Sequence, residues 1–237
     1  MDKKKILKFK KNLTVLILCG GKGLRLRPLT NNLPKPLIKI KEKSILENII
    51  KYFLKYKIKD FIIATGYKNH IIEKFIKKKF KSPNIKTLFT GLNSDIIYRI
   101  NKASKNSKKY FLICYGDTMI DIDINKYIIF FLKNSKKITV ASYRLETGFG
   151  IFDIKKNNTI FNFHEKPLLN IWFNVGYFLF SSNHFKFFKK YKKFEKLIQY
   201  LARKKLLTTY KHDGKHITIN TLAELEKAKK IAVNFIK

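Results

Sequence analysis

The sequence predicts an α/β fold built on a doubly wound, mainly parallel sheet, and three observations support this. From Leu13 onward, short apolar runs rich in β-branched residues alternate with segments of helical spacing. The run Tyr110–Cys114 is continuously apolar, as expected for a strand buried on both faces at the sheet centre. A glycine-rich turn directly follows the first apolar run. Ligands of such folds bind beyond the carboxyl ends of the strands.

The composition favours one folded domain. A chain of 237 residues with 45% hydrophobic and 14% aromatic content can bury a substantial core. We expect a basic N-terminal tail over residues 1–12 and a single domain over residues 13–237.

The formal net charge of +36 raises nucleic acid or an anionic membrane as a partner. However, the lysines are spread through almost every segment, and isoleucine, asparagine and phenylalanine are also abundant. This pattern favours drift toward AT-rich codons over selected binding of polyanions. No aromatic and basic recognition motif is present, so no specific nucleic-acid partner is expected. A homo-oligomer is compatible with the sequence.

The cysteines and the first residues indicate a cytoplasmic location. Cys19 and Cys114 each lie at the end of an apolar run, which is typical of buried free thiols in a reducing compartment. The basic start followed by Leu13–Cys19 is similar to a secretion signal, but the apolar run is short and Leu18 is too large to precede a cleavage site. No stretch reaches the roughly 18 apolar residues of a membrane span.

In the first half, strands and helices alternate. Ser44 and Glu47 form a capping box before apolar residues at helical spacing, which predicts a helix there. The further elements expected, in order, are a strand at Asp60–Thr65, a helix at Asn69–Phe80, a weaker strand at Lys86–Thr90, a helix at Ile97–Ser104 and the strand Tyr110–Cys114.

The second half is richer in strands. Three expected strands are joined by short turns, at Ile138–Tyr143, Gly150–Ile154 and Thr159–Phe163. Two basic helices with aromatic faces are expected at Phe185–Tyr191 and Phe194–Leu206, and a second capping box, Thr221 to Glu224, predicts the start of a final helix.

The stretch Leu13–Ile40 carries the strongest chemical signal. Glycines at positions 20, 21 and 23 allow backbone N–H groups to approach a phosphate closely. Arg25 and Lys35, which lies between two prolines, add positive charge; the alternative is a simple turn between two strands. The sequence GGKGLRLRPLT followed by PKPL resembles the N-terminal signature of the sugar-1-phosphate nucleotidyltransferases. Leu24 stands where that family usually has a small hydroxyl residue.

Asp117 follows the central strand and is therefore expected beside the glycine loop. A carboxylate there could be a helix cap or turn residue, but triphosphate chemistry requires a hard oxygen ligand for Mg²⁺. In the resembled family this Tyr-Gly-Asp aspartate binds the metal. Asp121 and Asp123 are expected to face solvent or cap a helix, not to form a second metal cluster.

Two motifs resemble the family's sugar-binding segments. Phe163–Pro167 resembles the F-x-E-K-P motif, which implies that Glu165 contacts sugar hydroxyls and that Lys166 contacts the sugar phosphate. Phe173–Tyr177 resembles the sugar-binding strand, where Asn174 would bind the sugar and Gly176 would let the backbone approach it. A β-bulge at Gly176 is the alternative.

Two further segments resemble the glucose-1-phosphate cytidylyltransferase type. In Tyr210–Glu224, His216 replaces a tryptophan, and Asn220 stands where the second metal-binding aspartate is expected. An amide oxygen brings no negative charge, so a weakened metal site is expected. In Thr90–Ile100, Arg99 matches the family's arginine, while Ile97 and Tyr98 replace paired glycines that would face the base.

The resemblance implies the nucleotide-diphospho-sugar transferase fold, which is Rossmann-like and has a β-rich sugar-binding half. It also implies nucleotidyl transfer from a nucleoside triphosphate, with CTP favoured, to a sugar 1-phosphate, with glucose 1-phosphate favoured. Mg²⁺ is the implied cofactor and polysaccharide biosynthesis the implied setting. The alternatives are a weakened or silent sugar-nucleotide-binding homologue, or a guanylyl-, uridylyl- or thymidylyltransferase.

The implied roles fall into four sets. Arg25 would neutralise the departing pyrophosphate and Lys35 would contact the phosphates, whereas Asp117 and Asn220 would hold the metal. The nucleotide would be bound by Cys19, Gly20, Gly21, Gly23, Arg99 and Gly116. The sugar phosphate would be bound by Gly150, Glu165, Lys166, Asn174 and Gly176.

Overall fold

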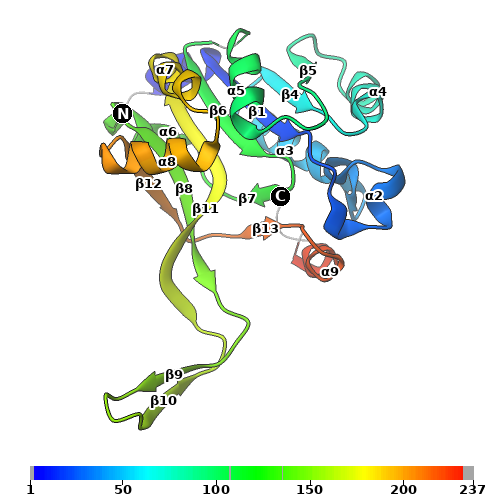
Figure 1. Cartoon of the computed structure of the whole chain (residues 1–237). Coiled ribbons are helices and arrows are strands. Elements are labelled where there is room, and N and C mark those ends of the chain that lie inside the picture. Colours follow the sequence, from blue (N-terminus) through cyan, green and yellow to red (C-terminus); the bar gives the residue numbers. More distant parts are fainter. Residues whose placement is uncertain (1–2, 107, 135, 232–237) are drawn as a thin grey trace.

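The computed structural model describes residues 3–106, 108–134 and 136–231. Its centre is a seven-stranded sheet in the order β12-β8-β11-β6-β1-β4-β5 (Figure 1). The strands are β1 (Leu13–Cys19), β4 (Phe61–Thr65), β5 (Ile85–Phe89), β6 (Tyr110–Tyr115), β8 (Ile138–Glu146), β11 (Leu168–Ser181) and β12 (Leu207–His212). Only β11 runs antiparallel to its neighbours, β6 and β8. The sheet is therefore mainly parallel with β6 at its centre, as predicted.

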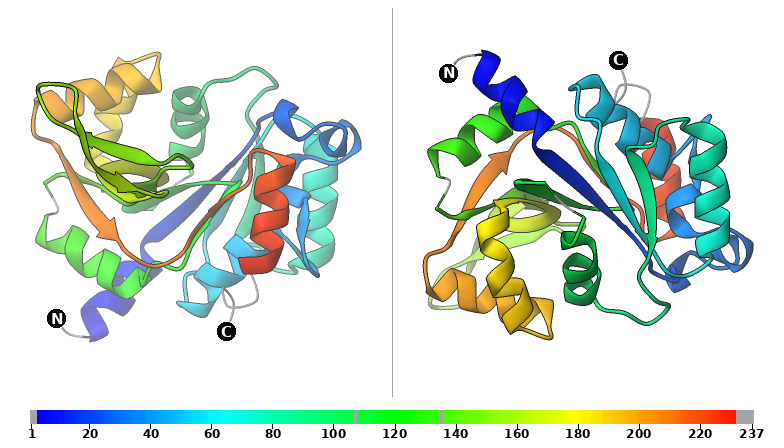
Figure 2. Two further views of the ribbon diagram at one scale, coloured as in Figure 1. Left: turned by 90° about the horizontal axis from the view of Figure 1, so that it is seen from below. Right: turned by 90° about the horizontal axis from the view of Figure 1, so that it is seen from above.

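Helices cover both faces of the sheet (Figure 2). One apolar cluster joins it to α1 (Lys3–Lys11), α3 (Ile45–Lys55), α4 (Asn69–Lys79), α6 (Ile124–Lys133) and α9 (Leu222–Ile231). The other joins it to α5 (Ile96–Ser104), α7 (Phe185–Lys190) and α8 (Phe194–Arg203). Side chains of β1 alternate between the two clusters, Val15 and Ile17 to the first and Leu16 to the second. This period of two explains why both faces of the strand are apolar.

The N-terminal segment differs from the expected tail. Lys3–Lys11 forms the helix α1, and Phe9 is only 4% exposed. The Phe9 ring stacks on Tyr110 at the start of β6, with ring centroids 3.9 Å apart. Phe9 also packs edge-on against Phe131 of α6, with ring centroids 5.8 Å apart. Lysines dominate the composition of the segment, whereas the aromatic contacts of Phe9 attach it to the body.

Both predicted capping boxes lie at the starts of helices. Ser44 Oγ accepts a hydrogen bond of 3.1 Å from the Glu47 N–H at the start of α3. Thr221 Oγ1 accepts from the Glu224 N–H at 3.2 Å, and the Glu224 carboxylate accepts in return from the Thr221 N–H at 2.9 Å. Side-chain acceptors at these positions satisfy N–H groups that the first helical turn leaves unpaired.

The two later aspartates have separate roles. Asp123 accepts from the N–H groups of Asn125 and Lys126 and caps α6, which is one of the two expected roles. Asp121 Oδ1 instead accepts a 2.6 Å hydrogen bond from the Lys215 N–H and lies 3.0 Å from His212 Nε2. Asp121 does not cap a helix, and its side chain, which is 32% exposed, contacts a segment nearly a hundred residues later.

Short elements surround the carboxyl ends of the central strands. They are η1 (Leu24–Leu26), α2 (Leu29–Asn32), η2 (Lys35–Leu37), β2 (Lys39–Ile40), β3 (Lys43–Ser44), β7 (Thr118–Ile120) and β13 (His216–Thr218). The short helix η3 (Ser182–His184) lies at the opposite edge of the sheet, where the Ser182 N–H donates to the Lys109 carbonyl just before β6. Antiparallel pairing of β13 with β7 brings the segment before α9 next to the turn after β6.

A hairpin of β9 (Ile151–Ile154) and β10 (Ile160–His164) projects from the body (Figure 1). We call this hairpin, with the adjoining ends of β8 and β11, the arm (residues 145–171). Several of its large apolar side chains are at least 38% exposed: Leu145, Phe149, Phe152, Ile154, Ile160, Phe161, Phe163, Leu168 and Ile171. The arm therefore packs little against the body of the described chain.

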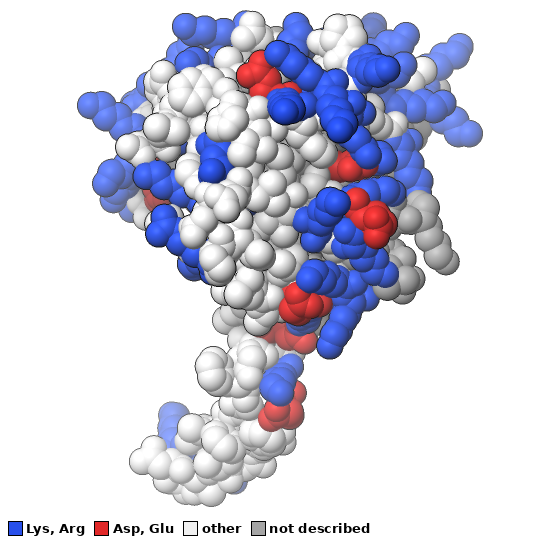
Figure 3. Space-filling model, turned by 90° about the vertical axis from the view of Figure 1, so that its right-hand side faces the viewer, with Lys and Arg blue, Asp and Glu red and all other residues white. Residues whose placement is uncertain are grey.

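On the face shown in Figure 3, lysine and arginine side chains gather densely over one part of the body, whereas the end of the arm is mostly uncharged. Within the described residues, no helix combines the length and the apolar character needed to cross a membrane.

Candidate active site

The glycine loop and the residues predicted to act with it line one cavity of about 430 Å³. The loop follows β1, Gly116 and Asp117 follow β6, and Asn220 follows β13. Strand order makes β1 and β6 parallel neighbours, so their carboxyl ends meet at one edge of the sheet. The cavity is lined by Leu18, Cys19, Gly21, Gly23, Leu24, Arg25, Lys35, Pro36, Gly116, Asp117 and Asn220.

The conformation of the loop depends on Gly23, which has a φ of 64°. A Cβ atom there would also lie 3.1 Å from side-chain atoms of Lys35 and Thr30. Thr30 Oγ1 donates a hydrogen bond of 2.9 Å to the Gly23 carbonyl and ties the loop to α2. Leu24, the departure from the family pattern, is 56% exposed at the rim of the cavity.

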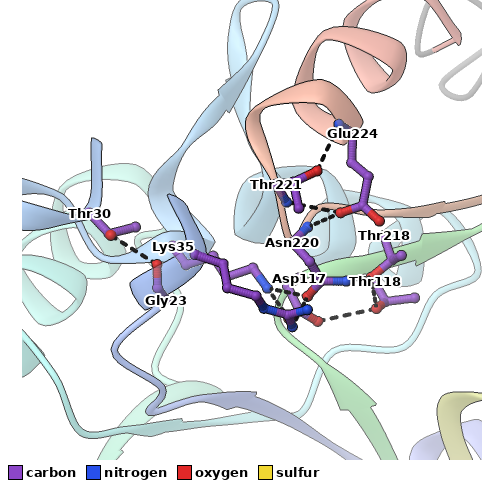
Figure 4. A network of polar contacts seen from close by, with 10 residues as sticks. Gly23, Thr30, Lys35, Asp117, Thr118, Thr218, Asn220, Thr221 and Glu224 are labelled. Atoms are coloured by element: carbon purple, nitrogen blue, oxygen red, sulfur yellow. Dashed lines mark hydrogen bonds and ion pairs between the residues drawn. The ribbon is translucent and has the colours of Figure 1, made fainter. Parts of the chain in front are cut away.

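A network of charged and polar groups occupies the cavity wall (Figure 4). Lys35 Nζ lies 2.5 Å from Asp117 Oδ2 and donates to Asn220 Oδ1 at 2.9 Å. Arg25 donates to the same Asn220 oxygen at 3.1 Å. Thr118 Oγ1 donates to the other Asp117 oxygen at 3.1 Å. Two cations therefore converge on one carboxylate and one amide, which leaves positive charge available for an anionic ligand.

The residues assigned to the metal fit a divalent cation. The Lys35 ammonium contacts Asp117 Oδ2 and Asn220 Oδ1 at once, so both oxygens already face one positive charge. Carboxylate and amide oxygens are the hard ligands that Mg²⁺ prefers. Across residues 3–106, 108–134 and 136–231, no group of three or more His, Cys, Asp or Glu could hold a metal ion.

A second cavity of about 680 Å³ adjoins the first on the far side of the glycine loop. It is lined by Gly20, Gly21, Ser94, Asp95, Ile96, Arg99, Tyr115 and Asp117, among others. The two residues that replace the family's glycines form the first turn of α5, where Asp95 caps the Tyr98 N–H. Ile97 is 3% exposed in the core and Tyr98 is 52% exposed. In this chain the turn is therefore helical, with one of its two apolar side chains in the core and the other exposed.

Cys19 and Gly116 both line the cavity of about 430 Å³. Cys19 is buried, and burial raises the pKa of its thiol well above the usual range. The thiol is therefore protonated and unreactive at neutral pH. The Gly116 N–H donates to the Leu18 carbonyl at 3.0 Å, and a Cβ at Gly116 would lie 2.6 Å from Cys19 Sγ. Gly116 thus allows the end of β6 to approach β1.

Asn174 and Gly176 lie on β11, at an irregularity in its pairing with β8. Asn174 Oδ1 accepts from the Gly176 N–H at 2.7 Å, and Gly176 has a φ of 81°. A Cβ at Gly176 would lie 2.3 Å from the Tyr115 ring. The bulge that the sequence left as an alternative is present, and it allows the backbone to approach Tyr115 closely.

The remaining residues that the sequence predicts to bind the sugar phosphate lie on the arm. Glu165 and Lys166 are each 61% exposed and form an ion pair of 3.3 Å with each other. Gly150 faces the Phe163 ring, where a Cβ would come within 2.4 Å. Because the arm projects from the body (Figure 1), this structure does not bring these three residues to Lys35 and Asp117.

Sequence reasoning missed the residues that hold Asn220 in place. The Glu224 carboxylate accepts hydrogen bonds from the Asn220 and Thr221 N–H groups, at 2.5 and 2.9 Å. Thr218 bonds to Thr118 at 3.2 Å across the β7 and β13 pair (Figure 4). The capping box gave a signal for Glu224, whereas nothing in the local sequence indicated the contact of the two threonines.

Comparisons with known proteins agree with this geometry. The sequence model of the nucleotidyl transferase family matches residues 14–220. D-glycero-alpha-D-manno-heptose 1-phosphate guanylyltransferase of Campylobacter jejuni is 30% identical over 182 residues, which cover 76% of this chain and 80% of that protein. Glucose-1-phosphate cytidylyltransferase of Salmonella typhimurium is 31% identical over 176 residues, which cover 64% and 68%.

Structural similarity extends over nearly the whole chain. The crystal structure of HddC from Yersinia pseudotuberculosis, complexed with GMP-PN, has a TM-score of 0.69 and 21% sequence identity. The match covers 92% of this chain and 98% of that one. The glycine loop, the strand order and the family match lead to the same conclusion: this chain belongs to the nucleotidyl transferase family.

Proposed function

We propose that the protein transfers a nucleotidyl group from a nucleoside triphosphate to a sugar 1-phosphate and releases pyrophosphate. One observation carries the proposal: Arg25, Lys35, Asp117 and Asn220 converge beside a glycine loop at the carboxyl ends of β1 and β6. An oxygen of the sugar phosphate attacks the α-phosphorus in line, and the bond between that phosphorus and the bridging oxygen to the β-phosphorus breaks. No protein nucleophile is required.

The chain contributes positioning and charge neutralisation. Backbone N–H groups of the glycine loop bind the triphosphate, because no side chain at positions 20, 21 and 23 blocks their approach. Arg25 neutralises the charge that develops on the departing pyrophosphate, and Lys35 contacts the phosphates near the reacting phosphorus. Asp117 and Asn220 would hold Mg²⁺, which supplies charge neutralisation on the phosphate oxygens when it is bound.

CTP and glucose 1-phosphate are the favoured substrates. The Salmonella relative is a glucose-1-phosphate cytidylyltransferase. Arg99 and the Tyr210–Glu224 segment resemble that type, apart from His216 and Asn220. The Campylobacter relative transfers a guanylyl group to a heptose 1-phosphate, so GTP is the second candidate. Asn174 and Gly176 on β11 would bind the sugar, with Glu165 and Lys166 of the arm completing the site.

The activity test is pyrophosphate release by the purified protein with Mg²⁺, each common triphosphate and a panel of sugar 1-phosphates. We expect turnover with CTP and glucose 1-phosphate. Asp117→Asn should lower kcat by about 10²-fold or more, because it removes the negative charge that contacts Lys35. Asp213→Asn is the matched control, since Asp213 is an exposed carboxylate elsewhere. Absence of pyrophosphate release from every pair would refute the enzymatic proposal.

A second candidate is a homologue that binds sugar nucleotides without turnover. It is favoured by Asn220, which replaces a charged metal ligand and already accepts hydrogen bonds from Arg25 and Lys35. This candidate predicts that triphosphates raise the Tm of the protein while no pyrophosphate forms. Recovery of turnover in Asn220→Asp would identify a weakened enzyme instead.

A further inference from the structure

The guanidinium of Arg99 lies beneath the glycine loop, at the carboxyl ends of β1, β4 and β5. Arg99 extends from the first turn of α5 and is 6% exposed. Its neighbours are the ends of three adjacent parallel strands, which also border the cavity of about 680 Å³. A buried cation in this place must either contact the nucleotide or hold the strand ends that do.

Its hydrogen bonds decide between these roles. A guanidinium carries five N–H donors. Arg99 Nε donates to the Ser94 carbonyl at 3.1 Å, and Nη1 donates to the Thr65 carbonyl at 3.1 Å and to Thr90 Oγ1. Nη2 donates to the carbonyls of Gly91 at 3.3 Å and Gly20 at 3.5 Å. All five donors therefore have a partner within the chain, and none is left for a substrate.

The acceptors are neutral oxygens. Within the described residues, Arg99 forms no ion pair, and the nearby Asp95 instead accepts from the Tyr98 N–H at 3.0 Å. Burial lowers the pKa of Arg99, yet an arginine stays charged because its ordinary pKa is so high. The planar guanidinium group can donate hydrogen bonds to carbonyls that lie in several directions, whereas a lysine ammonium has only three donors on one nitrogen.

The glycine loop is shaped around this side chain. A Cβ atom at Gly20 would lie 1.8 Å from Arg99 Nη1. At Gly66, which follows β4, a Cβ would lie 2.7 Å from the Gly20 carbonyl oxygen and 3.1 Å from Nη1. The guanidinium on one side of the loop therefore requires a glycine at position 20. This requirement does not depend on a phosphate at the other side of the loop.

We propose that Arg99 is a positioning residue, which fixes the strand ends and the glycine loop that border the nucleotide cavity. It acts on the nucleotide through the backbone of Gly20 and Gly91, without touching it. This inference rests on the proposed function and revises the direct nucleotide contact that the sequence assigned to Arg99.

The kinetic test compares Arg99→Lys and Arg99→Ala with the wild type. We expect the KM for the triphosphate to rise about 10- to 100-fold in both, since a loop displaced by about 1 Å loses its alignment. The KM for the sugar 1-phosphate should change by less than about twofold, because Asn174 and the arm lie elsewhere. Guanidinium chloride at millimolar concentration should restore part of the triphosphate affinity of Arg99→Ala and none in Arg99→Lys, where the lysine fills the space. Arg203→Ala, which removes an exposed arginine of α8, is the matched control.

A double-mutant cycle of Gly20→Ala and Arg99→Ala separates positioning from direct contact. The methyl group collides with the guanidinium only when Arg99 is present, so Gly20→Ala should lower the Tm and the affinity for Mg·CTP and Mg·GTP strongly in the wild type and little in Arg99→Ala. Additive effects would overturn the proposal, as would equal rises of both KM values. The Tm measurements of the cycle do not depend on turnover. If the effects of the two substitutions on the Tm are non-additive but no triphosphate binds, the proposed function is refuted and the placement of the loop by Arg99 stands.

Discussion

Replacing Asn220 by aspartate is the most informative perturbation of the site. The two side chains have the same shape, so the change adds a negative charge without altering the packing. Asn220 Oδ1 accepts from Lys35 Nζ at 2.9 Å and from Arg25 at 3.1 Å, and Nδ2 donates to Thr218 Oγ1 at 3.4 Å. Only the last and longest of these bonds is lost, and the Thr218 hydroxyl can rotate to donate to the new carboxylate.

The expected magnitude follows from these contacts. A hydrogen bond to a charged acceptor is worth about 1 kcal/mol more than one to a neutral acceptor. Two contacts to cations give about 2 kcal/mol, which corresponds to roughly 30-fold in an equilibrium constant. A divalent cation carries twice the charge of each of these cations, so it would gain about 4 kcal/mol from the new carboxylate and lose the roughly 2 kcal/mol of the contacts that it displaces, a net gain of about 2 kcal/mol. Asn220→Asp should therefore lower the Mg²⁺ concentration for half-maximal turnover by roughly 30-fold.

The assay is a Mg²⁺ titration of pyrophosphate release at saturating triphosphate and sugar 1-phosphate. Asn84→Asp is the matched control, because Asn84 is an exposed residue before β5, at the opposite edge of the sheet from the site. The control adds the same charge and should leave the Mg²⁺ requirement unchanged. A requirement that stays the same or rises in Asn220→Asp would refute the reasoning, since it would mean that Lys35 and Arg25 hold the new carboxylate away from the metal.

Three further predictions test the arm, the pH dependence and the core. Lys166→Ala should raise the KM for the sugar 1-phosphate by roughly 10-fold or more, because it removes the binding free energy of one charge-assisted hydrogen bond. The KM for the triphosphate should stay unchanged. Lys156→Ala, an exposed lysine of the same hairpin, is the control, and equal effects of the two would contradict a specific phosphate contact. Burial lowers the pKa of His216 from 6.5 to about 4, so the unfolded chain binds more protons than the folded chain between these values. The free energy of unfolding should therefore fall as the pH decreases from about 6.5 toward 4, and the fall should be smaller in His216→Phe, as measured by urea unfolding at each pH. Phe53→Ala should lower the free energy of unfolding by about 3–5 kcal/mol, because Phe53 is fully buried against Phe61 and Tyr177. Phe149→Ala, at a side chain that is 78% exposed, should change it by less than about 0.5 kcal/mol, and a similar loss in both would contradict the placement of the core.

Some expectations from the sequence depended on local signals, and these agreed with the structure. The capping boxes at Ser44 and Thr221 begin α3 and α9, because the groups that satisfy the first helical turn are only three residues apart. The expected helix at Asn69–Phe80 corresponds to α4, Asn69–Lys79, because its apolar residues recur at helical spacing. The lysine-rich composition of residues 1–12 indicated a tail, whereas the structure has a helix there. The helix is attached by the contact of Phe9 with Tyr110, which is distant along the chain and has no local signal.

By itself, the sequence determined the alternating fold, the glycine loop and the identity of the cations and carboxylate beside it. These follow from residue types and short spacings, which the backbone translates directly into strands, turns and helix caps. Only the tertiary structure decided that Lys35 contacts Asp117 and Asn220, that all donors of Arg99 are bound by the chain, that Asp121 contacts His212, and that Glu165 and Lys166 lie on a projecting arm. Each of these depends on segments that are distant along the chain and meet only through strand order, about which local sequence carries no information.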